Sequence, residues 1–99
     1  MELQEPWYAP ANAQALEEQL RAEVQLGHAL HNVPVEAIAA RQDRDDVLFA
    51  LKDGSARVAV VHLAYAANSD ARWPSATFFA DMASWLAEGM ARDCEEFNA

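Results

Sequence analysis

Residues 35–65 read VEAIAARQDRDDVLFALKDGSARVAVVHLAY, in which three short apolar runs are separated by two polar turns. The second turn contains Asp53-Gly54, a dipeptide that favours a tight hairpin connection. Apolar runs of this length, bounded by turn residues, are typical of β-strands. The stretch therefore predicts a three-stranded antiparallel meander whose first two strands span 35–41 and 47–51.

The hairpin also predicts how the second and third strands pair. A two-residue loop at 53–54 places Val47 opposite Val60, because the loop length fixes the register. In this register, alternate residues of the two strands share one face of the sheet. The predicted core side chains are Val47, Phe49, Leu51, Val58 and Val60.

An amphipathic helix precedes the meander. It begins after Asn12, an N-cap residue, and ends at Gly27. Its apolar side chains recur at helical spacing, at Leu16, Leu20 and Val24.

A second helix follows the meander, with Asp81 as its N-cap. Gly89 is expected to weaken this helix by about 1 kcal/mol relative to alanine. Residues 77–79 are a candidate fourth strand. The order helix, meander, helix predicts a single α+β domain over residues 1–99, built as two layers with both helices on one face of the sheet. The apolar face of the second helix comprises Met82, Trp85, Leu86, Met90, Cys94 and Phe97.

The composition restricts the class of partner. Sixteen acidic residues against seven basic ones give a net charge of −9, which disfavours binding to nucleic acids and to anionic membranes. The first ten residues lack the apolar core of a signal peptide, and no apolar run approaches the roughly 18 residues of a membrane span. We therefore expect a cytoplasmic protein. The single cysteine, Cys94, cannot form an intramolecular disulfide and is expected to be a small buried apolar side chain.

The histidines are candidate ligand-binding side chains. His28 and His31 share the loop 27–34, and the predicted register places His62 opposite Asp45, whose carboxylate can orient the imidazole. Neither a nucleophile motif nor a complete set of metal-ligand spacings accompanies them. We therefore predict no catalytic residue, no bound metal and no cofactor. A purely structural role for His62, tying the sheet to the preceding turn, stays open beside the functional one.

Three aromatic residues are candidate contacts for a protein partner. Trp7 and Tyr8 lie between two prolines in the segment 1–10, which is predicted to be extended, and Trp73 directly precedes another proline. Large aromatic side chains held in this way often anchor a partner. They also suit the core of a small, alanine-rich domain, so both roles stay open.

Several short motifs occur together along the chain. They are Gly27-His28-x-Leu30, the pattern DxDDVLFxLxDG over 43–54, VVHL over 60–63, and Trp73-Pro74. With these motifs the chain resembles a group of small uncharacterised bacterial proteins that share its order of helix and meander. The resemblance covers about residues 12–90. It implies a bacterial, cytosolic, single-domain α+β protein and no particular activity.

These observations favour a non-enzymatic protein-binding module. The acidic surface, together with an exposed apolar sheet face or the loop around Trp73, is expected to dock a protein partner or a second copy of the chain. The alternative is a small-molecule or metal site formed by His28, His31, His62 and Trp73.

Overall fold

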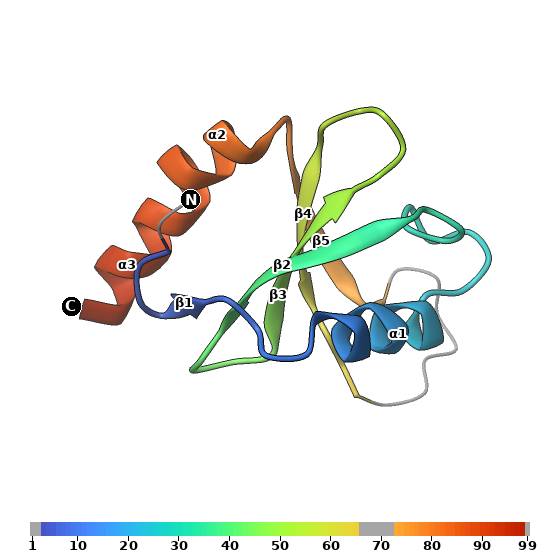
Figure 1. Ribbon diagram of the computed structural model, residues 1–99, viewed down its shortest axis with the longest axis horizontal. Helices are drawn as coiled ribbons and strands as arrows, with labels where there is room; N and C mark the ends of the chain where they lie inside the picture. Colours follow the sequence, from blue (N-terminus) through green and yellow to red (C-terminus); the bar gives the residue numbers. More distant parts are fainter. Residues whose placement is uncertain (1–2, 66–72, 99) are drawn as a thin grey trace.

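The computed structural model describes residues 3–65 and 73–98. The strands of these described residues form one antiparallel five-stranded sheet in the order β1-β2-β3-β4-β5 (Figure 1). The predicted α+β class and the meander are confirmed, and the sheet has five strands where three or four were expected. The elements are β1 (Trp7–Tyr8), α1 (Ala13–Glu23), β2 (Val35–Arg41), β3 (Asp46–Leu51), β4 (Val58–His62), β5 (Ser75–Phe79), α2 (Met82–Ser84), the π-helical η1 (Trp85–Met90) and α3 (Ala91–Asn98).

The last three elements run on into one another, and we call residues 82–98 the C-terminal helix. In the described ranges, no helix combines the length and the apolar character needed to cross a membrane. The predicted extended segment at the N-terminus supplies β1, which pairs with the end of β2 through Trp7 and Arg41.

The helices cover opposite faces of the sheet (Figure 1). Leu20 of α1 belongs to a buried cluster with Phe49, whereas Trp85 of the C-terminal helix belongs to a second cluster with Leu48. Successive side chains of a strand point to opposite faces, so the two clusters lie on different sides of β3. Contrary to the prediction, the helices therefore do not share one face. The reason is that β3 is apolar on both faces, and each face needs its own cover.

The pairing of β3 with β4 is shifted by one residue from the prediction. Val47 lies opposite Val61 rather than Val60. A shift of one residue moves every side chain of a strand to the other face. Val58 and Val60 therefore lie under the C-terminal helix and not, as predicted, on the same face as Val47, Phe49 and Leu51.

The loop between β3 and β4 explains the shift. It spans 52–56, because the N–H of Leu51 donates to the carbonyl of Arg57 at 3.0 Å. Within the loop, the carboxylate of Asp53 accepts hydrogen bonds from the N–H of Ser55 at 3.0 Å and from its hydroxyl at 2.6 Å. These bonds hold a wider turn than the predicted two-residue connection.

Gly89 lies where the indole of Trp85 leaves no room for a side chain. A Cβ atom at position 89 would lie 2.6 Å from Cδ1 of Trp85 and 3.1 Å from Cζ of Phe79. Trp85 is fully buried and surrounded by close-packed neighbours, so its ring cannot move aside without strain. The contact with Trp85 therefore opposes the gain in helix propensity that alanine would bring at this position.

We expect Gly89→Ala to lower the free energy of unfolding, by up to about 2 kcal/mol. Overpacking a core costs about 1–3 kcal/mol, and the better helix propensity of alanine returns about 1 kcal/mol. Urea unfolding followed by tryptophan fluorescence measures the change. The neighbouring exposed residue Glu88 provides the control, since Glu88→Ala should change stability by less than about 0.5 kcal/mol. A more stable Gly89→Ala protein would contradict the close contact.

Asp93 of α3 joins the C-terminal helix to the first two strands. Its carboxylate accepts a hydrogen bond from Nε1 of Trp7 at 3.1 Å and lies 3.4 Å from Nη1 of Arg41. Arg41 is buried and also donates two hydrogen bonds of 2.8 Å to Asp43. The rings of Trp7 and Trp85 meet edge to face, with centroids 5.2 Å apart. The polar contacts of Asp93 and the aromatic contact of Trp85 together fix the C-terminal helix to the sheet.

Candidate functional site

His28 has a structural place in the loop 27–34. Its Nδ1 accepts the N–H of Leu30 at 3.0 Å, so Nε2 carries the proton and donates to the carbonyl of Pro74 at 2.8 Å. The ring is buried. Both nitrogens are therefore used to hold the loop against the start of β5, which leaves neither of them for a ligand.

The other two histidines lie on different sides of the sheet. Nδ1 of His62 lies 2.7 Å from a carboxylate oxygen of Asp46, and the imidazole is exposed. The predicted partner, Asp45, is one residue away from this position, as the shifted register requires. Strand alternation places His62 on the face of the C-terminal helix, whereas His31 lines a cavity beside α1. Among the described residues, no group of three or more His, Cys, Asp and Glu side chains suits a metal ion.

The aromatic candidates also separate. Trp7 is 2% exposed and packs in the core, while Tyr8 is 47% exposed on the short edge strand β1. Trp73 is 50% exposed and is separated only by Pro74 from β5, at the other edge of the sheet. Trp73 is therefore the predicted aromatic candidate that is both exposed and close to β5.

β5 forms an open edge of the sheet. Its sequence, SATFF, contains no charged residue and no proline. β4 pairs with it on one side, and in the part of the chain that the structure describes no strand pairs on the other. Natural edge strands are commonly protected by charge, proline, a bulge or short length. The opposite edge has such protection because β1 is only 2 residues long, whereas β5 lacks it.

Exposed apolar surface accompanies this edge. Phe78 of β5 is 36% exposed, and the guanidinium of Arg57 lies 5.3 Å from the centroid of its ring. A cation over an aromatic face is a favourable contact that holds the ring in place. Together, Trp73, β5 and Phe78 form what we call the β5 edge.

The sequence identified Trp73 and placed Phe78 in the candidate strand 77–79, but it did not indicate Phe78 as a binding residue and missed the first two residues of β5. The signal was weak, since Ser75 and Ala76 are small residues without strong strand preference. Their place in the sheet comes from pairing with His62 and Val61.

No protein-family model, curated protein or solved structure compared with the chain matches it. Within the described residues, the β5 edge combines a strand without a partner on one side with exposed aromatic side chains.

Proposed function

We propose that this chain is a protein-binding module whose β5 edge pairs with an extended segment of a basic partner protein. The observation that carries the proposal is the uncharged strand β5 at the end of the sheet. An edge strand presents backbone N–H and C=O groups, and these are the groups that a further strand needs.

Side chains next to the strand support the same mode of binding. In strand addition, main-chain hydrogen bonds supply much of the affinity, and contacts with alternate side chains supply the specificity. Trp73 and Phe78 are exposed on or beside β5 and are suited to contact apolar side chains of the added strand. A partner segment that alternates apolar and polar residues fits this surface best.

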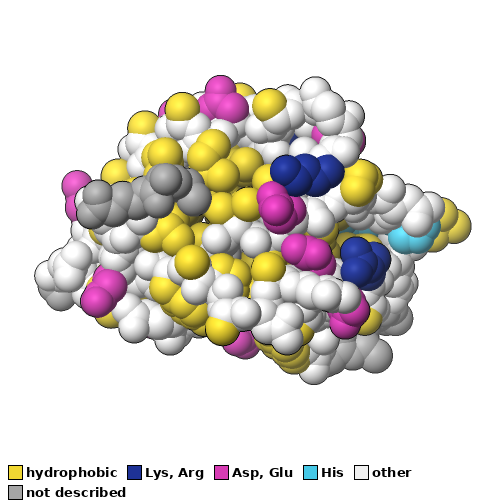
Figure 2. Space-filling model, viewed as in Figure 1, with side chains coloured by type: hydrophobic (Ala, Val, Ile, Leu, Met, Phe, Trp, Pro, Cys, Tyr) yellow, Lys and Arg dark blue, Asp and Glu magenta, His cyan; other side chains and the backbone are white. Residues whose placement is uncertain are grey.

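The charge of the chain supports a basic partner. The net charge is −9, and Figure 2 shows acidic side chains spread over the visible face, with the basic ones lying beside them. Such a field accelerates the approach of a positively charged protein and slows that of a second copy. Binding to a basic segment should therefore weaken as salt is added, whereas self-association should strengthen.

Proline substitutions test the role of the β5 backbone. Neighbouring residues of an antiparallel strand direct their N–H groups to opposite sides, so one of Ala76 and Thr77 donates to β4 and the other points away. Proline at the inward position should destabilise the fold, and proline at the outward position should be tolerated. Thermal unfolding of Ala76→Pro and Thr77→Pro shows which of the two positions is the inward one. The tolerated variant should lose partner binding, while Thr77→Val, which keeps its N–H, should retain it.

The binding partner is selected from random peptides displayed on phage, with the immobilised protein as bait. We expect the selected peptides to alternate apolar residues, to carry Lys or Arg, and to shift the backbone NMR signals of 75–79. Peptides that bind the tolerated proline variant as tightly as the wild type would overturn the proposal. A dimer of the protein alone that forms through β5 and strengthens with salt would instead make a second copy the occupant.

A further inference from the structure

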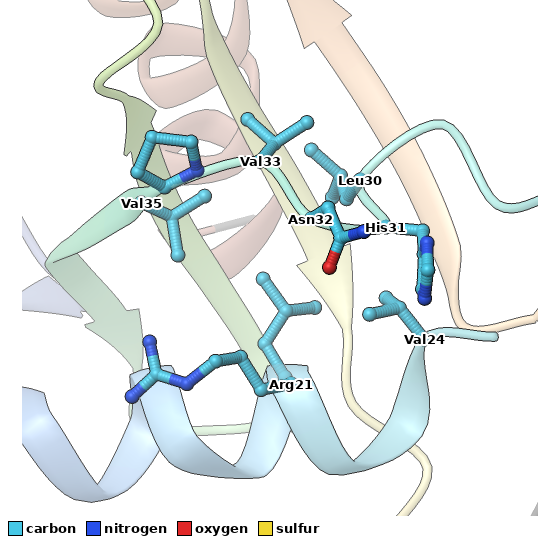
Figure 3. Close-up of a pocket in the computed structure, with 9 residues that line it drawn as sticks. Arg21, Val24, Leu30, His31, Asn32, Val33 and Val35 are labelled. Carbon is cyan, nitrogen blue, oxygen red and sulfur yellow. The ribbon is translucent and has the colours of Figure 1, made fainter. Parts of the chain in front are cut away.

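A cavity of about 360 Å³ lies between α1 and the segment 30–35 (Figure 3). Its volume is that of about a dozen water molecules and falls at the small end of the range of ligand pockets. Apolar side chains form much of its wall, including Leu20, Val24, Leu30 and Val33. A cavity of this size and lining suits a small organic molecule with an aliphatic chain.

Polar groups lie at separate points around this apolar wall. Figure 3 shows the guanidinium of Arg21 at one end, below Val35, and the imidazole of His31 at the other end, beside Val24. The carboxamide of Asn32 lies between them and points toward α1. Arg21 and Asn32 are exposed, so these groups lie where the cavity meets solvent.

The wall opposite α1 is held by local hydrogen bonds. The N–H of His31 donates to the carbonyl of His28 at 3.0 Å, and the N–H of Val33 donates to the carbonyl of Leu30 at 3.2 Å. Asn32 has a φ of 62°, a left-handed conformation that asparagine tolerates. The cavity is therefore formed before any ligand arrives, which reduces the entropy lost on binding.

Arg21 is a cation at this cavity without a carboxylate partner among the described residues. Arg41, Arg44 and Arg57 each pair with a carboxylate, whereas neither Arg21 nor Arg92 forms an ion pair within residues 3–65 and 73–98. Of these two, Arg21 lines the cavity and Arg92 does not. A guanidinium binds a carboxylate through two parallel hydrogen bonds, and more strongly beside an apolar wall that excludes water. We infer that the cavity binds a small aliphatic carboxylate, with its chain against Leu20 and its charged group on Arg21.

The test uses hexanoate as the probe and follows backbone NMR signals during a titration. Two analogues have the same chain length. Hexan-1-ol carries no charge, and hexylamine carries the opposite charge. We expect hexanoate to shift the signals of 20–24 and 30–35, and to bind at least about tenfold more tightly than either analogue. Equal binding of hexan-1-ol would overturn the inference, because the cavity would then recognise only the chain. Shifts that map elsewhere on the protein would overturn it as well.

Two arginine variants separate the local contact from the overall charge. Arg21→Gln should weaken hexanoate binding about tenfold, while Arg21→Lys should retain part of it. Arg92 is exposed on the C-terminal helix, so Arg92→Gln makes the same change in net charge away from the cavity and should leave binding unchanged. An equal loss in both glutamine variants would show that hexanoate responds only to net charge.

A third variant fills the cavity. Val24→Phe should abolish hexanoate binding in a protein whose NMR spectrum shows that it remains folded. None of these variants alters the β5 edge, so this outcome is independent of the protein-binding proposal.

Discussion

Trp85→Ala is expected to lower the free energy of unfolding by about 3–5 kcal/mol, the usual cost of removing a large buried aromatic side chain. Trp85 is 0% exposed and packs edge to face against Trp7. It belongs to the cluster that includes Leu48 and Met90, so its loss opens a cavity between the sheet and the C-terminal helix. A domain of this size is stabilised by about 5–15 kcal/mol in total, so the variant should be close to unfolding at 37 °C. Urea unfolding followed by circular dichroism measures the loss.

Two controls separate packing from the mere loss of a tryptophan. Trp85→Phe keeps an aromatic ring and removes Nε1, which is buried without a hydrogen-bond partner among the described residues. Its cost should therefore be smaller than that of Trp85→Ala, because removing an unsatisfied N–H offsets part of the lost packing. Trp73→Ala removes an exposed indole and should change stability by less than about 0.5 kcal/mol. A loss below about 1 kcal/mol in Trp85→Ala would contradict the packing of the C-terminal helix.

Arg41→Met is expected to lower the free energy of unfolding by about 2–3 kcal/mol. The arginine side chain is 2% exposed, and its partners Asp43 and Asp93 are 30% and 14% exposed. Burial by itself would lower the pKa of Arg41, yet the carboxylates of Asp43, Asp93 and Asp46 raise it overall, so pairing outweighs desolvation. Removing one partner of a fully buried pair costs about 3–5 kcal/mol, and solvent access to Asp43 reduces this cost. Methionine keeps the apolar part of the side chain in place.

The pH dependence of the Arg41→Met effect provides its test. The hydrogen bond from Arg41 holds the pKa of Asp43 below its usual value. A carboxylate with a lowered pKa contributes stability above about pH 4, and this contribution is lost as the pH falls through the lowered pKa. The difference between wild type and Arg41→Met should therefore shrink between pH 7 and pH 3 in chemical unfolding experiments. A difference that stays constant over this range would show that lost packing, and not the ion pair, causes the effect.

Local signals in the sequence identified the elements that depend on neighbouring residues. The side chain of Asn12 accepts the N–H of Ala15 at 3.1 Å and begins α1, as its residue type predicts. β2 has the predicted bounds, 35–41, and β3 begins one residue before the predicted strand at 47–51. Hydrophobic periodicity and capping are short-range properties, so a single sequence can reveal them.

The errors concern features that short sequence motifs and propensities do not specify. The register of β4 follows from hydrogen bonds within the loop 52–56, which the Asp53-Gly54 dipeptide does not specify. The need for glycine at position 89 depends on where Trp85 and Phe79 meet in space. A helix propensity scale describes neither the hydrogen bonds of the loop nor the contact at position 89.

The same limit applies to the candidate sites. The sequence pointed to the three histidines because they titrate near neutrality, but their positions on the sheet depend on the register of β4 and on the fold of the loop 27–34. β5 shows its open edge only once the strand order is known. The cavity beside α1 likewise requires that the segment 30–35 folds over Val24, which no local motif indicates.

The hydrogen bond between the side chains of Trp7 and Asp93 has a consequence for the order of folding. Each hairpin of the sheet joins strands that follow one another along the chain, and such local contacts form quickly. Trp7 and Asp93 are separated by 86 positions, so their contact closes a much longer loop at a larger entropic cost. We expect the central hairpins to form the folding nucleus, with β1 and the C-terminal helix docking after the transition state. Substitutions at Trp7 should then accelerate unfolding far more than they slow folding.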